Sequence, residues 1–154
     1  DNGEERSVVE LIDRLAARFG ADEVKRFVPQ GSHLPERAVT AVPALGSATQ
    51  PWPEPTQKPP RPLLLFSPAE AIEAMAVEVP DGPPRRFRWR GVVYDTVHVE
   101  GPERIAPEWW RARRDVRTRD YFRVEDREGH RFWLFRYGLY GRDPVLWFIQ
   151  GLFA

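Results

Sequence analysis

Hydrophobic residues in the first part of this chain recur with the period of an α-helix. Between positions 7 and 19, five apolar residues follow one another at spacings of three and four: Val8, Leu11, Ile12, Leu15 and Phe19. Ser7, with Glu10 three positions later, fits a capping box, and Gly20 fits a helix end. We therefore predict an amphipathic helix over residues 7–19 whose apolar stripe packs on other structure.

The second part of the chain changes to the pattern of β-strands. Apolar residues alternate with polar ones, or fill both faces, in these stretches: 72–79, 85–89, 92–99, 121–126, 130–137 and 145–153. Turn-forming sequences at 81–84 and 126–129 separate some of them. We predict that the chain leaves the sheet at Glu100 and returns to it at Tyr121.

Two of these stretches, 130–137 and 145–153, are apolar on both faces. Such strands lie in the centre of a sheet or in a closed barrel, because an open sheet with one wet face needs only one apolar side. The predicted fold class is therefore α+β and mainly β. We expect a small antiparallel barrel or strongly curled sheet of about six strands, preceded by one amphipathic helix and a Pro-rich linker.

Proline divides the chain into parts. Between positions 43 and 62 there are seven prolines: Pro43, Pro51, Pro53, Pro55, Pro59, Pro60 and Pro62. Together with Gly, Ser, Thr and Gln they favour a semi-rigid, polyproline-like linker. We predict a first segment over 1–42, a linker over 43–62 and a β domain over 63–154. Within the first segment, residues 21–28 fit either a helical turn or a strand.

Aromatic residues mark the expected core of the β domain. We predict eight of them as structural anchors: Phe87, Trp89, Trp109, Trp110, Tyr121, Phe122, Trp133 and Trp147. Such rings bring large apolar area to whatever they pack on. Two aromatic pairs, at 109–110 and 121–122, bracket the run 111–120, which holds five Arg against two acids and so cannot be core. The pattern predicts a basic loop that is pinned at both ends by aromatic residues.

Arginine is the second signal in the composition. All 16 basic residues after position 60 are Arg, a side chain suited to bidentate contacts with phosphate or carboxylate and to stacking on rings. The candidate residues for binding a partner or DNA are Arg86, Arg88, Arg90, Arg111, Arg113, Arg114, Arg117 and Arg119. A solvated loop, neutralised in part by Glu108, Asp115 and Asp120, explains the same pattern, and the sequence leaves both interpretations open. The formal net charge of zero argues against a protein that coats DNA.

Several classes of chemistry are missing from the sequence. There is no Cys, and His33, His98 and His130 do not have the spacing of metal ligands. Nucleophile elbows and Gly-rich phosphate loops are absent as well. We therefore expect no catalytic residue, no metal, no cofactor and no enzymatic activity. No apolar run approaches the roughly 18 residues of a membrane span, so we expect no membrane partner and a cytoplasmic location.

Residues 62–66, PLLLF, are similar to the short peptide that binds sliding clamps, which ends in Leu-x-Leu-Phe after a Gln. Leu63, Leu65 and Phe66 fit this pattern, whereas the Gln position holds Pro62. The polar anchor of the peptide is therefore missing. We favour the interpretation that these residues form the first strand of the β domain.

Several phrases of the chain resemble, in this order and spacing, the C-terminal third of the ImuB family: SHLPERAV at 32–39, RPLLLF at 61–66, PAEAIEA at 68–74, RFRWRG at 86–91, GPERIAPEWWR at 101–111, TRDYFRVED at 118–126, FWLFRYGLYG at 132–141 and WFIQGLFA at 147–154. ImuB proteins are Y-family-polymerase-like subunits of the bacterial damage-inducible mutasome. The resemblance covers essentially the whole chain. Residues 1–42 look like the end of the little-finger region, and 63–154 like the small domain that follows it.

The resemblance implies a function that composition does not reveal. ImuB proteins keep a Y-family scaffold without the catalytic carboxylates and act as hubs in SOS-induced translesion synthesis. They connect a RecA-like accessory protein of the ImuA type with an error-prone C-family DNA polymerase, and the sliding clamp is a further candidate partner. We therefore expect a protein-interaction module in a nucleoid-associated complex. The alternatives are a β domain that contacts single-stranded or primer-template DNA through its Arg-rich loop, and a domain that only stabilises the parent fold.

Overall fold

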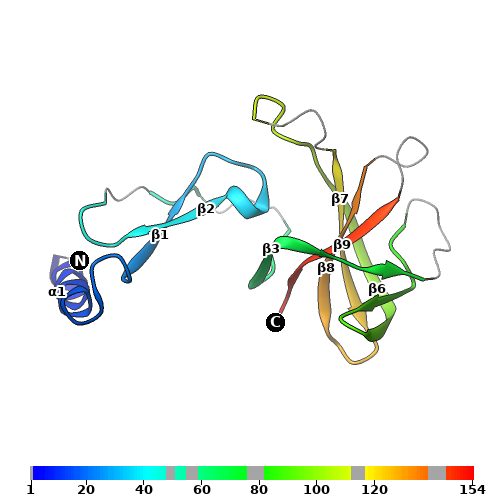
Figure 1. The fold of residues 1–154 in the computed structure, drawn as a ribbon, viewed down its shortest axis with the longest axis horizontal. Coiled ribbons are helices and arrows are strands. Elements are labelled where there is room, and N and C mark those ends of the chain that lie inside the picture. The colour runs from blue at the N-terminus through cyan, green and yellow to red at the C-terminus, as the bar shows by residue number, and fades with distance from the viewer. Residues whose placement is uncertain (1, 48–50, 55–58, 76–81, 112–116, 139–144) are drawn as a thin grey trace. The chain divides into compact units, whose positions relative to one another are not determined.

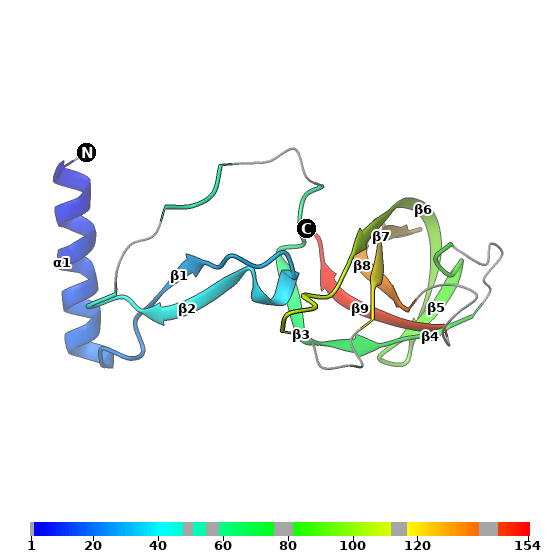
Figure 2. The same ribbon diagram turned by 90° about the horizontal axis from the view of Figure 1, so that it is seen from above.

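The computed structural model describes residues 2–47, 51–54, 59–75, 82–111, 117–138 and 145–154. The chain divides into two compact units, residues 1–57 and 58–154. Figures 1 and 2 show a helix and a strand pair in the first unit and a curled sheet in the second.

The first unit begins with helix α1, Asn2–Phe19, which is followed by β1 (Lys25–Pro29), the short 3-10 helix η1 (Pro35–Arg37) and β2 (Val39–Pro43). β1 and β2 form an antiparallel pair from Lys25↔Pro43 to Pro29↔Val39. Of the two options left open for residues 21–28, the strand is therefore the one that forms, from residue 25 onward. The pairing of β1 with β2 was not expected from the sequence.

Helix α1 starts earlier than its capping pattern suggests. Ser7 lies inside the helix rather than at its N-terminus, so the predicted capping box is wrong. The residues before Ser7 include Glu and Arg, which have good helix propensity, so helical structure continues through them. The predicted end is confirmed: Gly20 follows the last helical residue with φ 101°, and its N–H donates to the Ala16 carbonyl at 2.8 Å.

The second unit is a curled antiparallel sheet, and the predicted fold class is confirmed. The described residues form seven strands: β3 (Leu64–Ala71), β4 (Glu73–Ala74), β5 (Arg86–Trp89), β6 (Val92–Ile105), β7 (Arg119–Asp126), β8 (Arg131–Tyr137) and β9 (Leu146–Leu152). Their order in the sheet is β3-β9-β8-β7-β6-β5-β4. Except for β3, which lies beside β9, the strands follow the order of the chain, as in a meander.

One short stretch of chain joins the two edges of this sheet. β3 and β4 stand at opposite ends of the strand order, yet only Ile72 separates them. The Ile72 N–H donates to the Trp147 carbonyl on β9 at 3.0 Å, and the Met75 N–H donates to the Arg86 carbonyl on β5 at 2.8 Å. The sheet thus curls until both edges meet along residues 64–75. The sequence predicts about six strands, and the described residues form seven, with β3 and β4 as separate strands on either side of Ile72.

Strand β6 continues where the sequence predicts a loop. The expectation that the chain leaves the sheet at Glu100 is wrong, because β6 runs to Ile105 and pairs there with Arg119. The register shifts between Glu100 and Glu103, which is a β-bulge. Gly101 and Pro102 resemble a turn in sequence, but a bulge accommodates both residues without ending the strand.

The inner face of the curled sheet holds the core. Eight buried residues from β5, β7, β8 and β9 form it: Phe87, Trp89, Phe122, Val124, Phe132, Leu134, Trp147 and Ile149. Successive side chains of a strand point to opposite faces of the sheet. Tyr121 precedes the core residue Phe122, and Trp133 lies between the core residues Phe132 and Leu134, so both rings point to the outer face. Both are nevertheless almost completely buried, which shows that the outer face is also covered.

Candidate functional site

Four strands, β6 to β9, begin or end at the same end of the sheet. The register aligns Ile105 of β6 with Arg119 of β7, Arg119 with Tyr137 of β8, and Tyr137 with Leu146 of β9. The last residues of β6 and β8 and the first residues of β7 and β9 therefore lie at the same end of the sheet (Figure 1). We call this the Trp–Arg end and define it by Trp109, Trp110, Arg111, Arg117 and Arg119.

The Trp pair of this end is exposed. The Trp109 side chain is 81% exposed and that of Trp110 is 57% exposed, and the two rings meet edge to face with centroids 5.7 Å apart. The prediction that they anchor the core is therefore wrong. The inward positions of this segment belong to Ile105 and Glu108, which are 6% and 2% exposed, so the turn that follows projects both indoles into solvent. That turn is closed by the Arg111 N–H, which donates to the Glu108 carbonyl at 2.8 Å.

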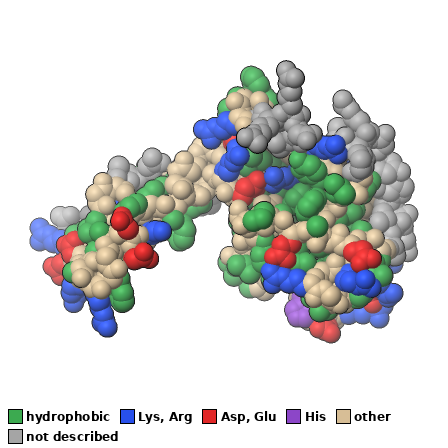
Figure 3. Space-filling view, viewed as in Figure 1, with side chains coloured by type: hydrophobic (Ala, Val, Ile, Leu, Met, Phe, Trp, Pro, Cys, Tyr) green, Lys and Arg blue, Asp and Glu red, His purple; other side chains and the backbone are tan. Residues whose placement is uncertain are grey.

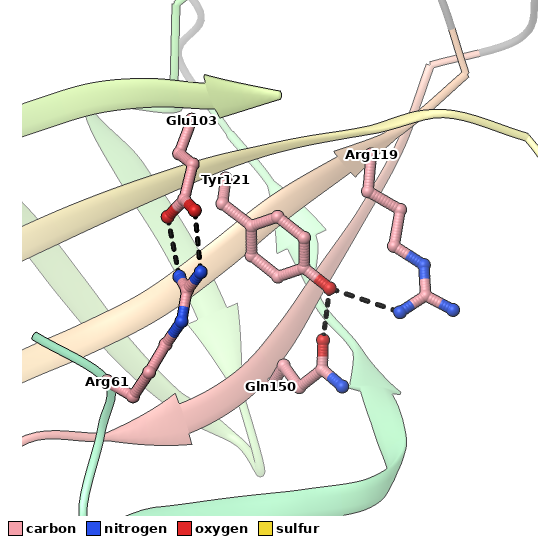
Figure 4. Close-up of polar contacts among 5 residues, drawn as sticks. All are labelled: Arg61, Glu103, Arg119, Tyr121 and Gln150. Carbon is pink, nitrogen blue, oxygen red and sulfur yellow. Dashed lines mark hydrogen bonds and ion pairs between the residues drawn. The ribbon is translucent and has the colours of Figure 1, made fainter. Parts of the chain in front are cut away.

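Arg117 and Arg119 lie on aromatic rings. The Arg117 guanidinium is 6.0 Å from the ring centre of Tyr137, and the Arg119 guanidinium is 5.1 Å from that of Phe135. Arg119 also donates from Nη1 to the Tyr121 hydroxyl at 3.1 Å, and that hydroxyl donates to Oε1 of Gln150 at 2.5 Å (Figure 4). These contacts fix both arginines at the edge of the outer face.

A buried carboxylate supports the strands beneath this end. Asp120, 1% exposed, accepts hydrogen bonds from Arg104 at 2.7 and 3.0 Å and from Arg136 at 2.6 Å. Burial raises the pKa of Asp120, but the hydrogen bonds from the two guanidinium groups lower it by more, so its pKa lies below the ordinary value. Asp120 is therefore ionised at neutral pH and ties β6, β7 and β8 together.

The structure does not gather all eight candidate arginines. Arg113 and Arg114 lie outside the described residues. Arg86 and Arg88 are on β5 and Arg90 directly follows it, and we call these three the β5 arginines. β5 pairs with residues 92–95, at the opposite end of β6 from Ile105. The Trp–Arg end thus contains only part of the predicted set.

The β5 arginines are neutralised by acids on neighbouring strands. Ion pairs join Arg86 to Asp95 at 2.5 Å, Arg88 to Glu73 at 2.9 Å and Arg90 to Glu70 at 2.5 Å. The hydrogen bond from Arg90 lowers the pKa of Glu70, and the one from Arg86 lowers that of Asp95. Figure 3 shows basic and acidic side chains beside one another on the face that it presents. These three candidate binding residues are therefore charge-balanced.

The PLLLF segment forms part of the sheet. Leu64 and Leu65 pair with Leu152 and Gly151 of β9, and Phe66 packs against the core, 5.6 Å from the Trp89 ring. Leu63, just before the strand, is 84% exposed. A clamp that reads this segment as a free extended peptide would first have to separate it from β9, so binding to a clamp stays a prediction.

One group of possible metal ligands comes together in the described part of the chain. Asp126, Glu128 and His130 place one ligand atom each within 4.8 Å of one another in the turn between β7 and β8. Asp126 already accepts the N–H groups of Glu128 and His130 at 2.9 and 2.8 Å, and it lies 2.9 Å from Nδ1 of His130. This bonding closes the hairpin, so we assign the group a structural role.

One further contact, between Arg61 and Glu103, is not among the sequence-based predictions. Arg61 donates to both carboxylate oxygens of Glu103, at 2.5 and 2.6 Å (Figure 4). Its guanidinium also lies 4.8 Å from the ring centre of Trp133. Arg61 and Glu103 are 42 residues apart in the sequence. The one related signal is the alternation of side chains along β8, which places Trp133 on the outer face of the sheet.

Comparison with known proteins gives one relationship. No protein-family model matches the chain, and no solved structure matches it. Two curated proteins from two strains of Caulobacter vibrioides, both named Protein ImuB, are 46% identical to this chain over 157 aligned positions. The alignment covers 97% of this chain and 34% of each relative, so the chain spans about a third of their length. Among the described helices, none has the length and apolarity needed to cross a membrane.

Proposed function

This chain is related over nearly its whole length to a C-terminal region of ImuB, and on that premise we propose that it is a non-catalytic protein-interaction module of translesion DNA synthesis. The partners that the resemblance suggests are a RecA-like accessory protein of the ImuA type and an error-prone C-family polymerase. The sliding clamp is a third candidate. In this proposal the module holds such partners together and performs no chemistry itself.

The observation that carries the proposal is the exposure of Trp109 and Trp110. Trp and Arg are enriched among the residues that dominate binding energy at protein interfaces. Here two exposed indoles stand beside Arg111, whose side chain is 61% exposed. Single exposed apolar residues are ordinary on a protein surface, but two adjacent indoles next to a cation form a larger anchor for a partner.

A second candidate function is binding of single-stranded DNA at the same end. Exposed indoles next to arginines also suit this ligand, because bases stack on aromatic rings and phosphates pair with cations. Against it, the β5 arginines are paired with acids and the formal net charge is zero. We therefore rank a protein partner first and DNA second.

The Trp pair allows a direct test. We expect the double substitution Trp109→Ala and Trp110→Ala to weaken binding to the RecA-like protein or the polymerase at least tenfold, or about 1.4 kcal/mol, because hot-spot residues contribute that much or more. Surface plasmon resonance with each purified partner measures the change. Trp52→Ala is the matched control, since Trp52 is 60% exposed but lies in the linker. Full binding by the double variant to every partner would refute the proposal.

A further inference from the structure

The end of the Pro-rich linker is seated on the outer face of the sheet. We call residues 59–62, of sequence PPRP, the strap. Within the strap Pro62 is buried and Arg61 is partly buried, whereas Pro59 and Pro60 are exposed. The strap therefore contacts the β domain mainly through its last two residues.

Arg61 contacts two side chains that are well suited to bind an arginine. Glu103 on β6 accepts both donors of its guanidinium fork, at 2.5 and 2.6 Å, and the Trp133 ring on β8 lies 4.8 Å from the guanidinium carbon. A carboxylate matches the fork in geometry and charge, and an indole face attracts a cation. The neighbouring acid, Glu100, pairs with Arg123 at 2.8 Å, so Glu103 supplies the negative charge that faces Arg61.

Gly151 makes room for Pro62. A Cβ atom built on Gly151 would lie 2.5 Å from Cγ of Pro62 and 2.6 Å from the Leu64 carbonyl oxygen. Carbon atoms do not approach that closely, so the proline ring fits against β9 only because position 151 is glycine. The seat of the strap thus has a pocket for a proline ring as well as a site for an arginine.

The strap does not fill the surface on which it lies. A cavity of about 260 Å³ remains, lined by Pro59 and Pro60 on one side and by outer-face residues on the other: Glu100, Gly101, Glu103, Tyr121, Arg123 and Trp133. Proline-rich segments bind aromatic-lined grooves well because their extended conformation is already formed before binding. A longer segment of the same chemistry would occupy this cavity in addition to the seat.

We propose that the outer face, at Glu103, Trp133 and Gly151, is a recognition site for an arginine within a proline-rich segment of a partner protein, and that the strap occupies this site in cis. A tethered ligand acts at an effective concentration in the millimolar range. The strap therefore excludes a partner segment of moderate affinity until it is displaced. The residues that define this site, Glu103, Trp133 and Gly151, do not include the Trp pair, so the proposal does not depend on the function proposed above.

The test measures binding of a labelled peptide to the full 154-residue chain. The probe is a fluorescein-labelled peptide with the sequence of residues 58–64, KPPRPLL, and its anisotropy reports binding. We expect the Arg61→Ala variant to bind it at least tenfold more tightly than the wild type does, because Glu103 and Trp133 are no longer occupied by Arg61. Adding Glu103→Gln should abolish this gain. Adding Glu128→Gln, at a side chain 81% exposed in the β7–β8 turn, makes the same charge change and should leave the gain intact.

Two further arms decide between explanations. The first uses a probe with Ala in place of its arginine, which should not bind the Arg61→Ala variant. The second adds Trp109→Ala and Trp110→Ala to the Arg61→Ala variant, and this triple variant should bind the original probe as tightly as Arg61→Ala does. If Arg61→Ala does not fold, as judged by circular dichroism, Arg61→Lys replaces it, because lysine keeps the charge but lacks the planar fork. Binding no tighter than that of the wild type, or a gain that survives Glu103→Gln, overturns the proposal.

Discussion

At the scale of single residues, the ion cluster around Asp120 shows how a buried charge is held. Arg136, its closest partner, is itself only 3% exposed, so neither charge is solvated by bulk water. A buried pair of this kind contributes little net stability compared with apolar residues of the same shape, but removing one partner leaves the other charge unpaired. Asp120 is therefore a position where loss of charge is costly.

We expect Asp120→Asn to lower the free energy of unfolding by about 3 to 5 kcal/mol, because Arg136 stays buried without its counter-charge. Urea denaturation followed by tryptophan fluorescence measures the change. Asp95→Asn is the control, since Asp95 pairs with Arg86 at a site where both side chains are partly exposed, and such a pair contributes about 1 kcal/mol or less. Equal effects of the two substitutions would contradict the role given to burial.

The same variant has a pH signature. The pKa of Asp120 in the folded chain lies below the ordinary value of 3.8, so the unfolded chain takes up this proton first on acidification. The stabilisation by the ionised carboxylate is therefore fully present above about pH 3.8 and is lost as the pH falls through the folded pKa. The difference in unfolding free energy between wild type and Asp120→Asn should be constant at neutral pH and shrink below about pH 3.8. A constant difference down to about pH 2 would argue against this assignment.

The Trp pair shows where reasoning from residue type reaches its limit. Large rings are usually buried, so position in the sequence predicts Trp109 and Trp110 as anchors as readily as Tyr121 and Trp133. Their actual exposure depends on the turn that begins after Ile105, and in that turn Glu108 rather than a ring faces inward. Composition around the pair contains no sign of this, because the turn direction is set by tertiary packing.

At the scale of elements, alternation was a sound guide to the strands and a poor guide to their ends. β5, β7, β8 and β9 lie within two residues of the predicted ranges. The predicted range for β6 ends too early, because the Gly–Pro pair inside its bulge has the composition of a turn. The expectation that residues 62–66 form the first strand of the β domain is confirmed from Leu64 onward, because β3 spans Leu64–Ala71. Of the predicted strand 72–79, the described residues form the short strand β4, Glu73–Ala74, and residues 76–79 lie outside them.

Gly151 tests the close approach of β9 and the segment that precedes β3. We expect Gly151→Ala to destabilise the β domain by about 1 to 3 kcal/mol, because the added methyl would overlap Pro62 and the Leu64 carbonyl and the backbone would have to move. Thermal unfolding measures the loss. Gly31→Ala is the matched control, since a Cβ at Gly31 has no neighbour within 4 Å. A Gly151→Ala variant as stable as the control would show that the two segments separate easily.

At the scale of the whole molecule, charge decides between the two candidate functions. The 23 basic and 23 acidic residues balance, and the β5 arginines are paired, which leaves Arg111, Arg117 and Arg119 as the described cations of the Trp–Arg end. Three phosphate contacts to single-stranded DNA give a slope of about −2 for log K against log salt concentration.

We therefore expect any binding of a labelled single-stranded oligonucleotide to weaken no more steeply than that slope, and binding of a protein partner through the Trp pair to change little with salt. Fluorescence anisotropy from about 50 to 500 mM salt measures both. A slope of about −4 or steeper for DNA would mean that more cations take part, and it would move DNA binding to first place.

For the candidate sites, as for the fold, some features could be predicted from the sequence and others could not. The sequence located the arginine run and the aromatic residues, because composition alone marks them. It could not pair Arg61 with Glu103 or align the ends of β6 and β8, because these arrangements join segments far apart in the chain and depend on register. Register is specified by which face of each strand is buried, which becomes known only once the sheet is assembled.

The stretch 64–75 that joins the two edges of the sheet also constrains how the domain is made. Leu64 on β3 pairs with Leu152 on β9, so the first strand of this sheet to be synthesised finds its partner only after β9 has followed. Until then β3 and β8 both present unpaired backbone edges, which attract other chains. Such a domain closes late and over a long span of sequence, a topology that folds slowly. Its solubility during synthesis then depends on how quickly β9 is added.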